Sequence, residues 1–160
     1  MYTFQEMDTS SAQEMLKWSY PDKYAIYNVH SDQNKIEDEI AFFIDPANQY
    51  YSIKDENGVM VAYCCFGEDA RVPGGDYSID ALDVGAGTHP DLTGQGNGHL
   101  LLGAILDFGR KTLQPTHFRA TVAAVNSRAQ RACEKAGYHR VDEFTRESDG
   151  REFYILLQDA

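Results

Sequence analysis

The sequence has no long hydrophobic run. Its longest uninterrupted apolar stretch, Val59 to Phe66, has eight members, whereas a helix that crosses a bilayer needs ~20. The first ten residues, MYTFQEMDTS, contain no basic group followed by an apolar segment, so we predict no signal peptide. We therefore expect a cytoplasmic protein that is not inserted in a membrane.

Disulfide and metal-ligand patterns are also missing. The three cysteines, Cys64, Cys65 and Cys133, are odd in number and contain no CxxC pair. This favours reduced thiols over a disulfide framework or a zinc site. The five histidines show no HxH or HxxxH spacing. We therefore expect no metal cofactor.

Basic residues are scarce. There are 14 Lys and Arg against 25 Asp and Glu, which gives a formal net charge of -11. Such a field repels nucleic acid, whose binding depends on neutralising phosphates, and it attracts a cationic partner such as a protonated amine. The acidity could equally serve only to keep the protein in solution.

What remains is an ordinary globular composition, with 42% hydrophobic and 24% charged residues in a chain of 160. Neither an internal repeat nor a linker interrupts it, so we expect residues 1–160 to form one domain. Strands and helices alternate irregularly, which predicts an α/β or α+β protein with a layered sheet. The expected strands are 2–5, 50–54, 59–66, 77–88, 117–125, 138–146 and 151–157, and the expected helices are about 10–19, 34–44, 99–112 and 128–135.

Local signals mark several of these ends. Asn57-Gly58 predicts a hairpin between strands 50–54 and 59–66, Asp45-Pro46 should stop the second helix, and Gly137 should cap the last helix. Gly85 and Gly87 inside strand 77–88 suggest a bulge or a close backbone approach. The apolar stripe of helix 99–112 is expected to consist of Leu101, Ile105 and Phe108, widened by Leu102.

The segment from Thr88 to His99 is the most informative. A strand ends there, glycines stand at positions 94, 96 and 98, and an amphipathic helix follows. Glycines let backbone N–H groups point inward, and a helix N-terminus adds partial positive charge, so this pattern predicts a phosphate or pyrophosphate site. Neither the Walker A motif nor the dinucleotide fingerprint GxGxxG fits, because no Gly-Lys-Ser/Thr follows and residue 99 is His. A plain flexible turn is the alternative.

Two motifs in this part of the chain resemble those of GNAT N-acetyltransferases. The family has a Val/Thr-His-Pro-Asp-like corner and then Arg/Gln-x-x-Gly-x-Gly/Ala; here residues 88–91 read Thr-His-Pro-Asp and 93–98 read Thr-Gly-Gln-Gly-Asn-Gly. A second family segment, Asn-x-x-Ala with a Glu-Lys-x-Gly-Phe ending, corresponds to residues 126–129 and 134–138. The resemblance implies a mixed, mostly antiparallel sheet with helices on both faces and splayed central strands.

The resemblance also implies a binding site for acetyl-CoA. Backbone amides near the glycines would hold the pyrophosphate, and the pantetheine arm would lie between strands 77–88 and 117–125. Asn126 would contact the pantetheine, although it could also simply cap the following helix. The residues expected to bind acetyl-CoA are Thr88, Thr93, Gly94, Gln95, Gly96, Asn97, Gly98, His99 and Asn126.

For catalysis, the resemblance points to Asp83. Many family members carry a carboxylate on the strand before the turn, where it acts as a general base through water. Asp80 and Asp76 are nearby alternatives, and Asp83 could instead only supply negative potential for a cationic amine.

Two positions depart from the family pattern. Thr93 replaces Arg or Gln at the head of the turn, so a phosphate contact is missing or is made by the hydroxyl. Cys133 stands where the family tyrosine reprotonates the CoA thiolate. The thiol could donate that proton, or it could be a small buried helix residue. A ping-pong route through acetylated Cys133 lacks a His-Asp pair to activate it.

The resemblance implies transfer of acetyl to a primary amine, on a small molecule or a protein N-terminus, by direct attack in a ternary complex. A non-catalytic acyl-CoA-binding sensor is the alternative; a nucleotide-binding protein unrelated to CoA is disfavoured by the second motif. Monomer and homodimer both stay open. The aromatic stretch 18–27 resembles a bacterial subgroup of uncharacterised and ribosomal-protein-acetylating enzymes, although we prefer to explain it by an aromatic core with a helix-breaking proline. Its aromatic members are Trp18, Tyr20, Tyr24 and Tyr27.

Overall fold

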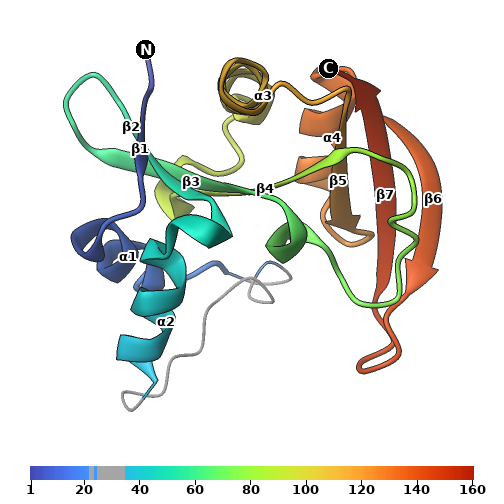
Figure 1. Cartoon of the computed structure of the whole chain (residues 1–160), viewed down its shortest axis with the longest axis horizontal. Coiled ribbons are helices and arrows are strands. Elements are labelled where there is room, and N and C mark those ends of the chain that lie inside the picture. Colours follow the sequence, from blue (N-terminus) through green and yellow to red (C-terminus); the bar gives the residue numbers. More distant parts are fainter. Residues whose placement is uncertain (22–23, 25–34) are drawn as a thin grey trace. The chain divides into compact units, whose positions relative to one another are not determined.

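The computed structural model describes residues 1–21, 24 and 35–160 (Figure 1). Tyr27 and the expected start of the second helix at Asn34 lie outside these residues. The described chain divides into two compact units, and the prediction of a single domain stays a prediction. The first unit joins Met1–Cys65 to Ala86–Thr93, and the second joins Phe66–Gly85 to Gly94–Ala160.

The first unit is built on an antiparallel ladder of β1 (Thr3–Glu6), β2 (Tyr50–Lys54) and β3 (Met60–Phe66). The predicted Asn-Gly hairpin joins β2 to β3. There Gly58 has φ +78° and donates its N–H to the Asp55 carbonyl, 3.0 Å away. Glycine adopts this left-handed conformation without a Cβ penalty, which is why the hairpin was readable from the sequence.

Two helices complete the first unit, α1 (Thr9–Leu16) and α2 (Ile36–Ile44). The helix α1 ends earlier than the predicted Ser19, because Lys17 and Trp18 donate their N–H groups to carbonyls only three residues back, which tightens and closes the last turn. The predicted stop of α2 at Asp45-Pro46 is confirmed, and a short 3-10 helix, η2 (Pro46–Asn48), follows.

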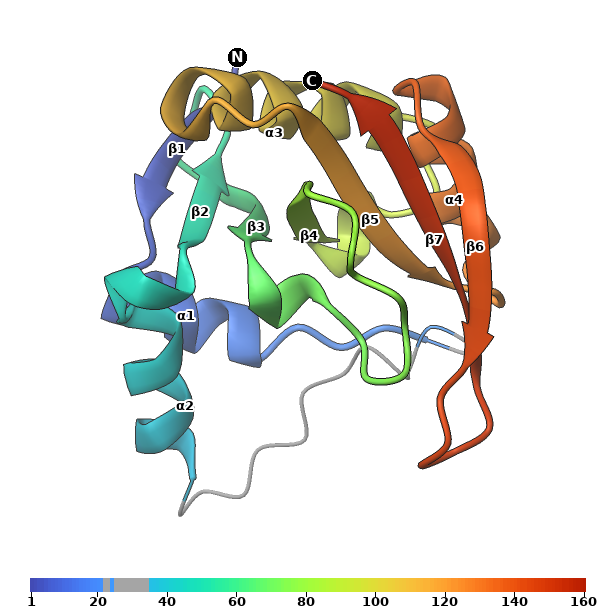
Figure 2. The ribbon, with the colours of Figure 1, turned by 45° about the vertical axis from the view of Figure 1, so that its right-hand side comes forward.

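In the second unit, β7 (Glu152–Asp159) lies between β5 (His117–Ala123) and β6 (His139–Thr145), antiparallel to both (Figure 2). The strand β4 (Leu82–Thr88) starts in this unit, where it pairs in parallel with β5, and its last residues belong to the first unit. Among the described residues the strand order is β1-β2-β3-β4-β5-β7-β6, a mixed and mostly antiparallel sheet. The predicted fold class is confirmed.

The prediction that a strand begins at Tyr77 is wrong, because β4 begins at Leu82. Side chains rather than a neighbouring strand hold the preceding segment. The Tyr77 hydroxyl accepts the Val72 N–H at 2.8 Å, and Arg119 Nη1 donates to the Ile79 carbonyl at 2.7 Å. The apolar and aromatic residues there therefore belong to an anchored loop.

Two further helices lie in the second unit, α3 (Gly98–Leu113) and α4 (Ser127–Lys135). Of the stripe predicted for α3, Leu101 and Ile105 are buried, whereas Phe108 is only half-buried. Leu106 widens the stripe in place of the expected Leu102. Gly109 allows close packing, since a Cβ there would lie 3.0 Å from the Phe66 ring.

The predicted C-terminal cap of α4 at Gly137 is confirmed. This glycine has φ +104°, and the next residue, Tyr138, donates its N–H to the Cys133 carbonyl at 2.9 Å. The pair forms a Schellman motif, which needs a left-handed residue at that position. Across the part of the chain that the structure describes, no helix is both long and apolar enough to cross a membrane.

Candidate functional site

The glycine-rich turn before α3 is an exposed backbone cradle. Gly94 and Gly96 have φ +75° and +78°, and a Cβ added at Gly96 would meet no heavy atom within 4 Å. Asn97 is the N-cap of α3 but makes no side-chain capping bond, and the first turn of the helix carries no acidic residue. The first N–H groups of α3 lack intrahelical acceptors. This cradle can therefore receive an anion at the positive end of the helix dipole.

The predicted phosphate-binding residues from Gly94 to His99 lie together in this turn and the first residues of α3. Asn126 caps the neighbouring helix α4, and its Oδ1 accepts the Ala129 N–H at 3.0 Å. The first turns of α4 pack beside the cradle, because a Cβ at Gly98 would lie 3.4 Å from the Ala132 Cβ. The capping role of Asn126 is thus observed, and a contact with pantetheine stays a prediction.

The corner that precedes the cradle in sequence belongs to the first unit. His89 donates its backbone N–H to the Val61 carbonyl at 2.8 Å, and the 3-10 helix η4 (Pro90–Leu92) follows. The Thr93 hydroxyl donates to the Pro90 carbonyl at 2.8 Å. Since a hydroxyl has one proton, Thr93 has none left to donate to a phosphate in this conformation.

In the second unit, β4 and β5 pair over a very short distance. The parallel ladder contains Leu82↔Phe118 and Asp83↔Arg119. It ends there, although β4 continues through Val84 and Gly85 and β5 continues to Ala123. This is the splaying of central strands that the family resemblance implies.

Asp83 is the centre of a buried ion-pair cluster. Its side chain is 2% exposed, and its oxygens accept bonds from Arg119 Nε at 2.6 Å, Arg119 Nη2 at 2.8 Å and Arg71 Nε at 2.8 Å. Both guanidinium groups also lie over the Tyr77 ring, at 4.9 and 5.3 Å from its centroid. The hydrogen bond to Asp83 raises the pKa of Arg119 above its ordinary value.

These contacts favour a structural role for Asp83, because two arginines enclose both of its oxygens. Its role as a general base stays a prediction. Of the alternatives, Asp80 is exposed, and Asp76 is exposed and accepts the Ser78 N–H at 3.0 Å. Hydrogen bonds from Ser78 lower the pKa of Asp76, which weakens it as a base.

Aromatic side chains surround the end of β4 within the first unit. Trp18 is 8% exposed, and its ring centroid lies 6.0 Å from that of Tyr63 and 5.2 Å from that of His89. The Tyr20 hydroxyl donates to the Thr88 carbonyl at 2.7 Å, and burial raises the pKa of Tyr20 to about 12. Gly87 is required here, since a Cβ would lie 2.4 Å from the Tyr63 ring. The predicted close backbone approach at a β4 glycine is therefore confirmed at Gly87.

The comparisons with known proteins decide the family. The sequence model of the Acetyltransferase (GNAT) family matches residues 12–138. The chain belongs to the GNAT acetyltransferase family. GNAT enzymes use acetyl-CoA as the acetyl donor, and the cradle before α3 fits a pyrophosphate by its exposed amides and helix N-terminus.

Solved structures with the same fold include several N-acetyltransferases. A spermidine N-acetyltransferase from Vibrio cholerae, in complex with CoA and spermine, has a TM-score of 0.77 at 13% identity, covering 99% of this chain and 95% of that one. The aminoglycoside acetyltransferase AAC(6')-Ib with coenzyme A has a TM-score of 0.75 at 16% identity, with 99% and 95% covered. A GNAT-family acetyltransferase from Bacillus anthracis has a TM-score of 0.75 at 14% identity, with 99% and 94% covered. No curated protein sequence matches the chain.

Cys133, which the family resemblance aligns with the GNAT tyrosine, is buried in α4, at 5% exposure. Burial raises the pKa of its thiol to about 12. A tyrosine has an ordinary pKa of about 10, so Cys133 holds its proton more tightly than the family residue that it replaces. The contacts favour the buried-residue interpretation, and a proton-donor role stays a prediction.

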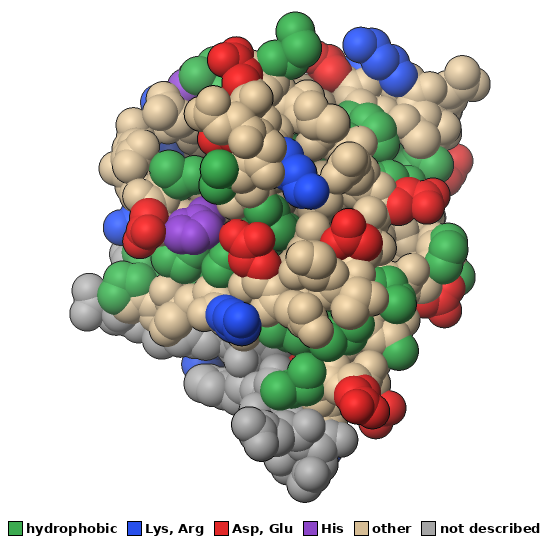
Figure 3. Space-filling model, turned by 90° about the vertical axis from the view of Figure 1, so that its left-hand side faces the viewer, with side chains coloured by type: hydrophobic (Ala, Val, Ile, Leu, Met, Phe, Trp, Pro, Cys, Tyr) green, Lys and Arg blue, Asp and Glu red, His purple; other side chains and the backbone are tan. Residues whose placement is uncertain are grey.

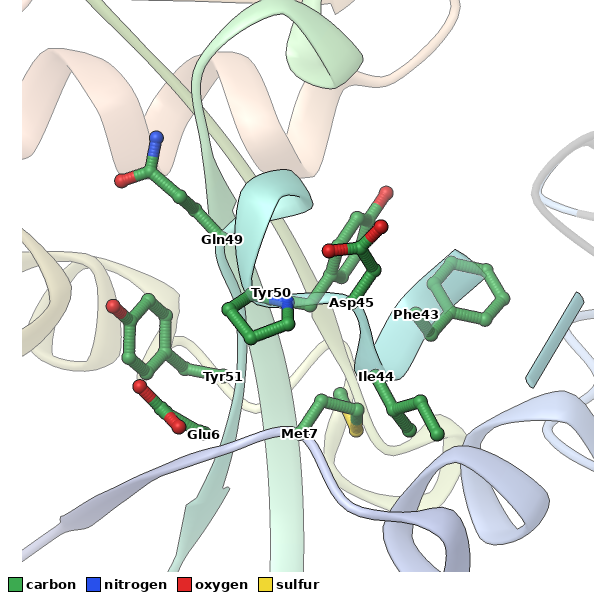
Figure 4. Close-up of a pocket in the computed structure, with 9 residues that line it drawn as sticks. Glu6, Met7, Phe43, Ile44, Asp45, Gln49, Tyr50 and Tyr51 are labelled. Atoms are coloured by element: carbon green, nitrogen blue, oxygen red, sulfur yellow. The ribbon is translucent and has the colours of Figure 1, made fainter. Parts of the chain in front are cut away.

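A small pocket lies in the first unit of this GNAT protein, between β1, β2 and the end of α2 (Figure 4). Glu6 and Tyr51 are directly paired across β1 and β2 and lie side by side at one end of it. Burial, and then the charge of Glu6, raises the pKa of Tyr51. The Asp45 carboxylate accepts the Ala47 N–H at 3.0 Å and so caps η2. The Asp45 carboxylate is therefore accounted for by the cap of η2.

Sequence reasoning missed the partners of Asp83. Arg119 stands 36 residues away, and no motif or spacing links the two positions. The exposed or buried state of an arginine is also not readable from its neighbours in sequence. Only the parallel register of β4 and β5 brings the pair together.

Proposed function

We propose that this chain transfers the acetyl group of acetyl-CoA to a primary amine by direct attack in a ternary complex, with residues 1–160 acting as one catalytic domain. The observation that carries the proposal is the exposed glycine cradle at the N-terminus of α3. Family membership supports acetyl-CoA as its ligand. The short ladder between β4 and β5 supports a place for the pantetheine arm.

Acetyl-CoA supplies a thioester carbonyl. The acceptor ammonium first loses one proton to solvent, and the neutral amine then forms a C–N bond to the carbonyl carbon as the C–S bond breaks. The nitrogen gives up a second proton, and the CoA sulfur takes one. The chain's own residues hold and orient the acetyl-CoA. Amides of the cradle hold the pyrophosphate, and Asn126, at the head of α4, contacts the pantetheine side. The cluster of Asp83 and Arg119 fixes the start of β4 against β5.

The acceptor is a cationic primary amine. The net charge of -11 supports this, because it concentrates cations near the surface. Acidic side chains are spread over the face shown in Figure 3 rather than gathered in one patch. Fold neighbours that bind spermine and ribostamycin support a small amine, and the family resemblance of residues 18–27 keeps a ribosomal-protein N-terminus as a second acceptor. A cytoplasmic location and a monomer or homodimer belong to this proposal.

A second candidate is an acyl-CoA-binding sensor without catalysis. The position of Cys133 favours it, because a buried thiol with a pKa of about 12 replaces the proton-donating tyrosine of the family. The two functions share the cradle but differ in turnover.

The test combines a thermal-shift titration with acetyl-CoA and an assay of CoA-thiol release against polyamines, aminoglycosides, amino acids and N-terminal peptides. Binding with release on at least one amine supports the enzyme. Binding with no release across the panel supports the sensor, and no binding contradicts both.

A matched pair of variants locates the binding. Gly96→Ala and Gly58→Ala place a Cβ at the same φ of +78°, with no heavy atom within 4 Å in either case. Both lose roughly 1–2 kcal/mol to left-handed strain. Only Gly96→Ala should weaken acetyl-CoA binding, because only Gly96 lies in the cradle. Equal binding by the two variants would contradict the cradle as the pyrophosphate site.

A further inference from the structure

The cradle lacks the basic or amide side chain that the GNAT pattern has at its head. Thr93 stands there, and its hydroxyl proton is engaged by the Pro90 carbonyl. The protein as a whole is strongly acidic, at -11, and acetyl-CoA is itself an anion. A cation near the cradle would offset that repulsion locally.

The first turn of α4 places such a cation beside the cradle. A Cβ added at Gly94 would lie 3.3 Å from Cζ and 3.3 Å from Nη2 of Arg128. Arg128 is the second residue of α4 and is exposed. Its guanidinium therefore lies directly against the start of the turn, in the same unit as the cradle.

The orientation of α4 is fixed by three further contacts. Ala132, one helical turn after Arg128 on the same face, packs against Gly98. The Gln130 side chain donates to the carbonyls of Ala123 and Ala124, at 3.2 and 2.8 Å, which ties α4 to the end of β5. The Asn126 cap fixes the first turn. The face that carries Arg128 is thereby held toward the cradle.

We propose that Arg128 binds the pyrophosphate of acetyl-CoA and supplies the cationic contact that Thr93 does not. The inference rests on the proposed binding of acetyl-CoA at the cradle. A guanidinium suits this position because its planar N–H groups match two phosphate oxygens at once. Cradle amides and Arg128 would then hold the pyrophosphate from different elements, α3 and α4.

The experiment measures dissociation constants by calorimetry for CoA and for dephospho-CoA, which lacks the 3′-phosphate. Arg128→Ala should raise both constants about tenfold or more, because it removes charge-assisted hydrogen bonds. The dissociation constants of Arg128→Lys should lie between those of the wild type and Arg128→Ala, since lysine keeps the charge but cannot donate two parallel N–H bonds to a phosphate. In ³¹P spectra, the pyrophosphate resonances of bound CoA should move toward their free positions in Arg128→Ala.

Lys111→Ala is the matched control. It removes the same unit charge from the last turn of α3, which lies ~20 Å along the helix from Gly98 and beyond the screening length of ~8 Å in physiological salt. It should leave both constants within about twofold of the wild type. A melting curve of unliganded Arg128→Ala, recorded alongside, shows that the variant is folded at the temperature of the titration.

Three other outcomes would contradict the proposal. If Arg128→Ala binds CoA as tightly as the wild type does, Arg128 does not contact the cofactor. If Arg128→Ala loses affinity for CoA but not for dephospho-CoA, Arg128 contacts the 3′-phosphate and the pyrophosphate assignment is wrong. No binding of CoA by the wild type would overturn both the inference and the proposed function. Binding by the wild type without turnover of any amine would overturn the proposed enzyme alone, and the two affinities would still decide the role of Arg128.

Discussion

Replacing Asp83 by Asn should destabilise the protein severely. Asp83 and Arg119 each have a side chain only 2% exposed, and two bonds of 2.6 and 2.8 Å join them. Asn keeps the shape but removes the charge, so Arg119 is left buried without a counter-charge. Breaking a buried pair in this way costs about 3–5 kcal/mol. For a chain of this length each kcal/mol lowers Tm by roughly 2–4 °C, so we expect a drop of about 6–20 °C.

Thermal and denaturant unfolding measure this change, and two comparisons isolate its cause. Asp107→Asn removes an exposed carboxylate that pairs with Arg110 at 2.8 Å, and it should cost at most about 0.5 kcal/mol. The double variant Asp83→Leu with Arg119→Met removes both buried charges and should recover much of the stability lost by Asp83→Asn.

Asp83→Asn also separates a structural role of Asp83 from a catalytic one. A catalytic base makes the rate of acetyl transfer rise with pH, because the base must be deprotonated to act. If Asp83 is structural, Asp83→Asn should lose much stability, while the rate per folded molecule still rises with pH. A general base predicts the reverse: a small loss of stability and a pH–rate profile that no longer rises. A cost below about 1 kcal/mol for Asp83→Asn would refute the buried-pair reasoning.

Three shorter predictions follow from other contacts. Gly87→Ala should lower the free energy of unfolding by about 1–3 kcal/mol, because the new Cβ overpacks against the Tyr63 ring. The loss should be much smaller in a Tyr63→Leu background. Equal losses in the two backgrounds, measured by chemical unfolding, would contradict the close approach of Gly87 to Tyr63. Asn126→Ala should lower the free energy of unfolding by about 1 kcal/mol through loss of the α4 cap, while Asn126→Ser should stay near the wild type. If calorimetry shows that both variants bind acetyl-CoA as tightly as the wild type does, Asn126 makes no pantetheine contact. The three cysteines are buried, and burial raises the pKa of Cys133 to about 12. A thiol reagent at pH 8 should therefore label no cysteine in the native protein and all three in denaturant. Rapid labelling of the native protein would contradict their burial.

Local chemistry made much of this fold predictable. Gly58 and Gly137 stand where the backbone needs a left-handed residue, so a hairpin and a helix end were readable from them. The glycine turn before α3 was likewise readable as an anion cradle, because both its glycines and its helix stripe are local features.

What could not be predicted depends on partners far away in sequence. The true start of β4 at Leu82 follows from side-chain bonds of Tyr77 and Arg119, which only the folded chain brings together. The enclosure of Asp83 and the approach of Arg128 to Gly94 arise in the same way. A sequence pattern can name a carboxylate on a strand, but it cannot say which charges will surround it.

The position of β7 has a consequence for how the chain is made. This strand follows β6 in the sequence, yet it is the strand that joins β5 to β6. During vectorial synthesis β5 and β6 emerge first, each with an unpaired edge that another chain could join. The second unit closes only when residues 152–159 leave the ribosome, so these late residues set the period in which a nascent chain is exposed to misassembly.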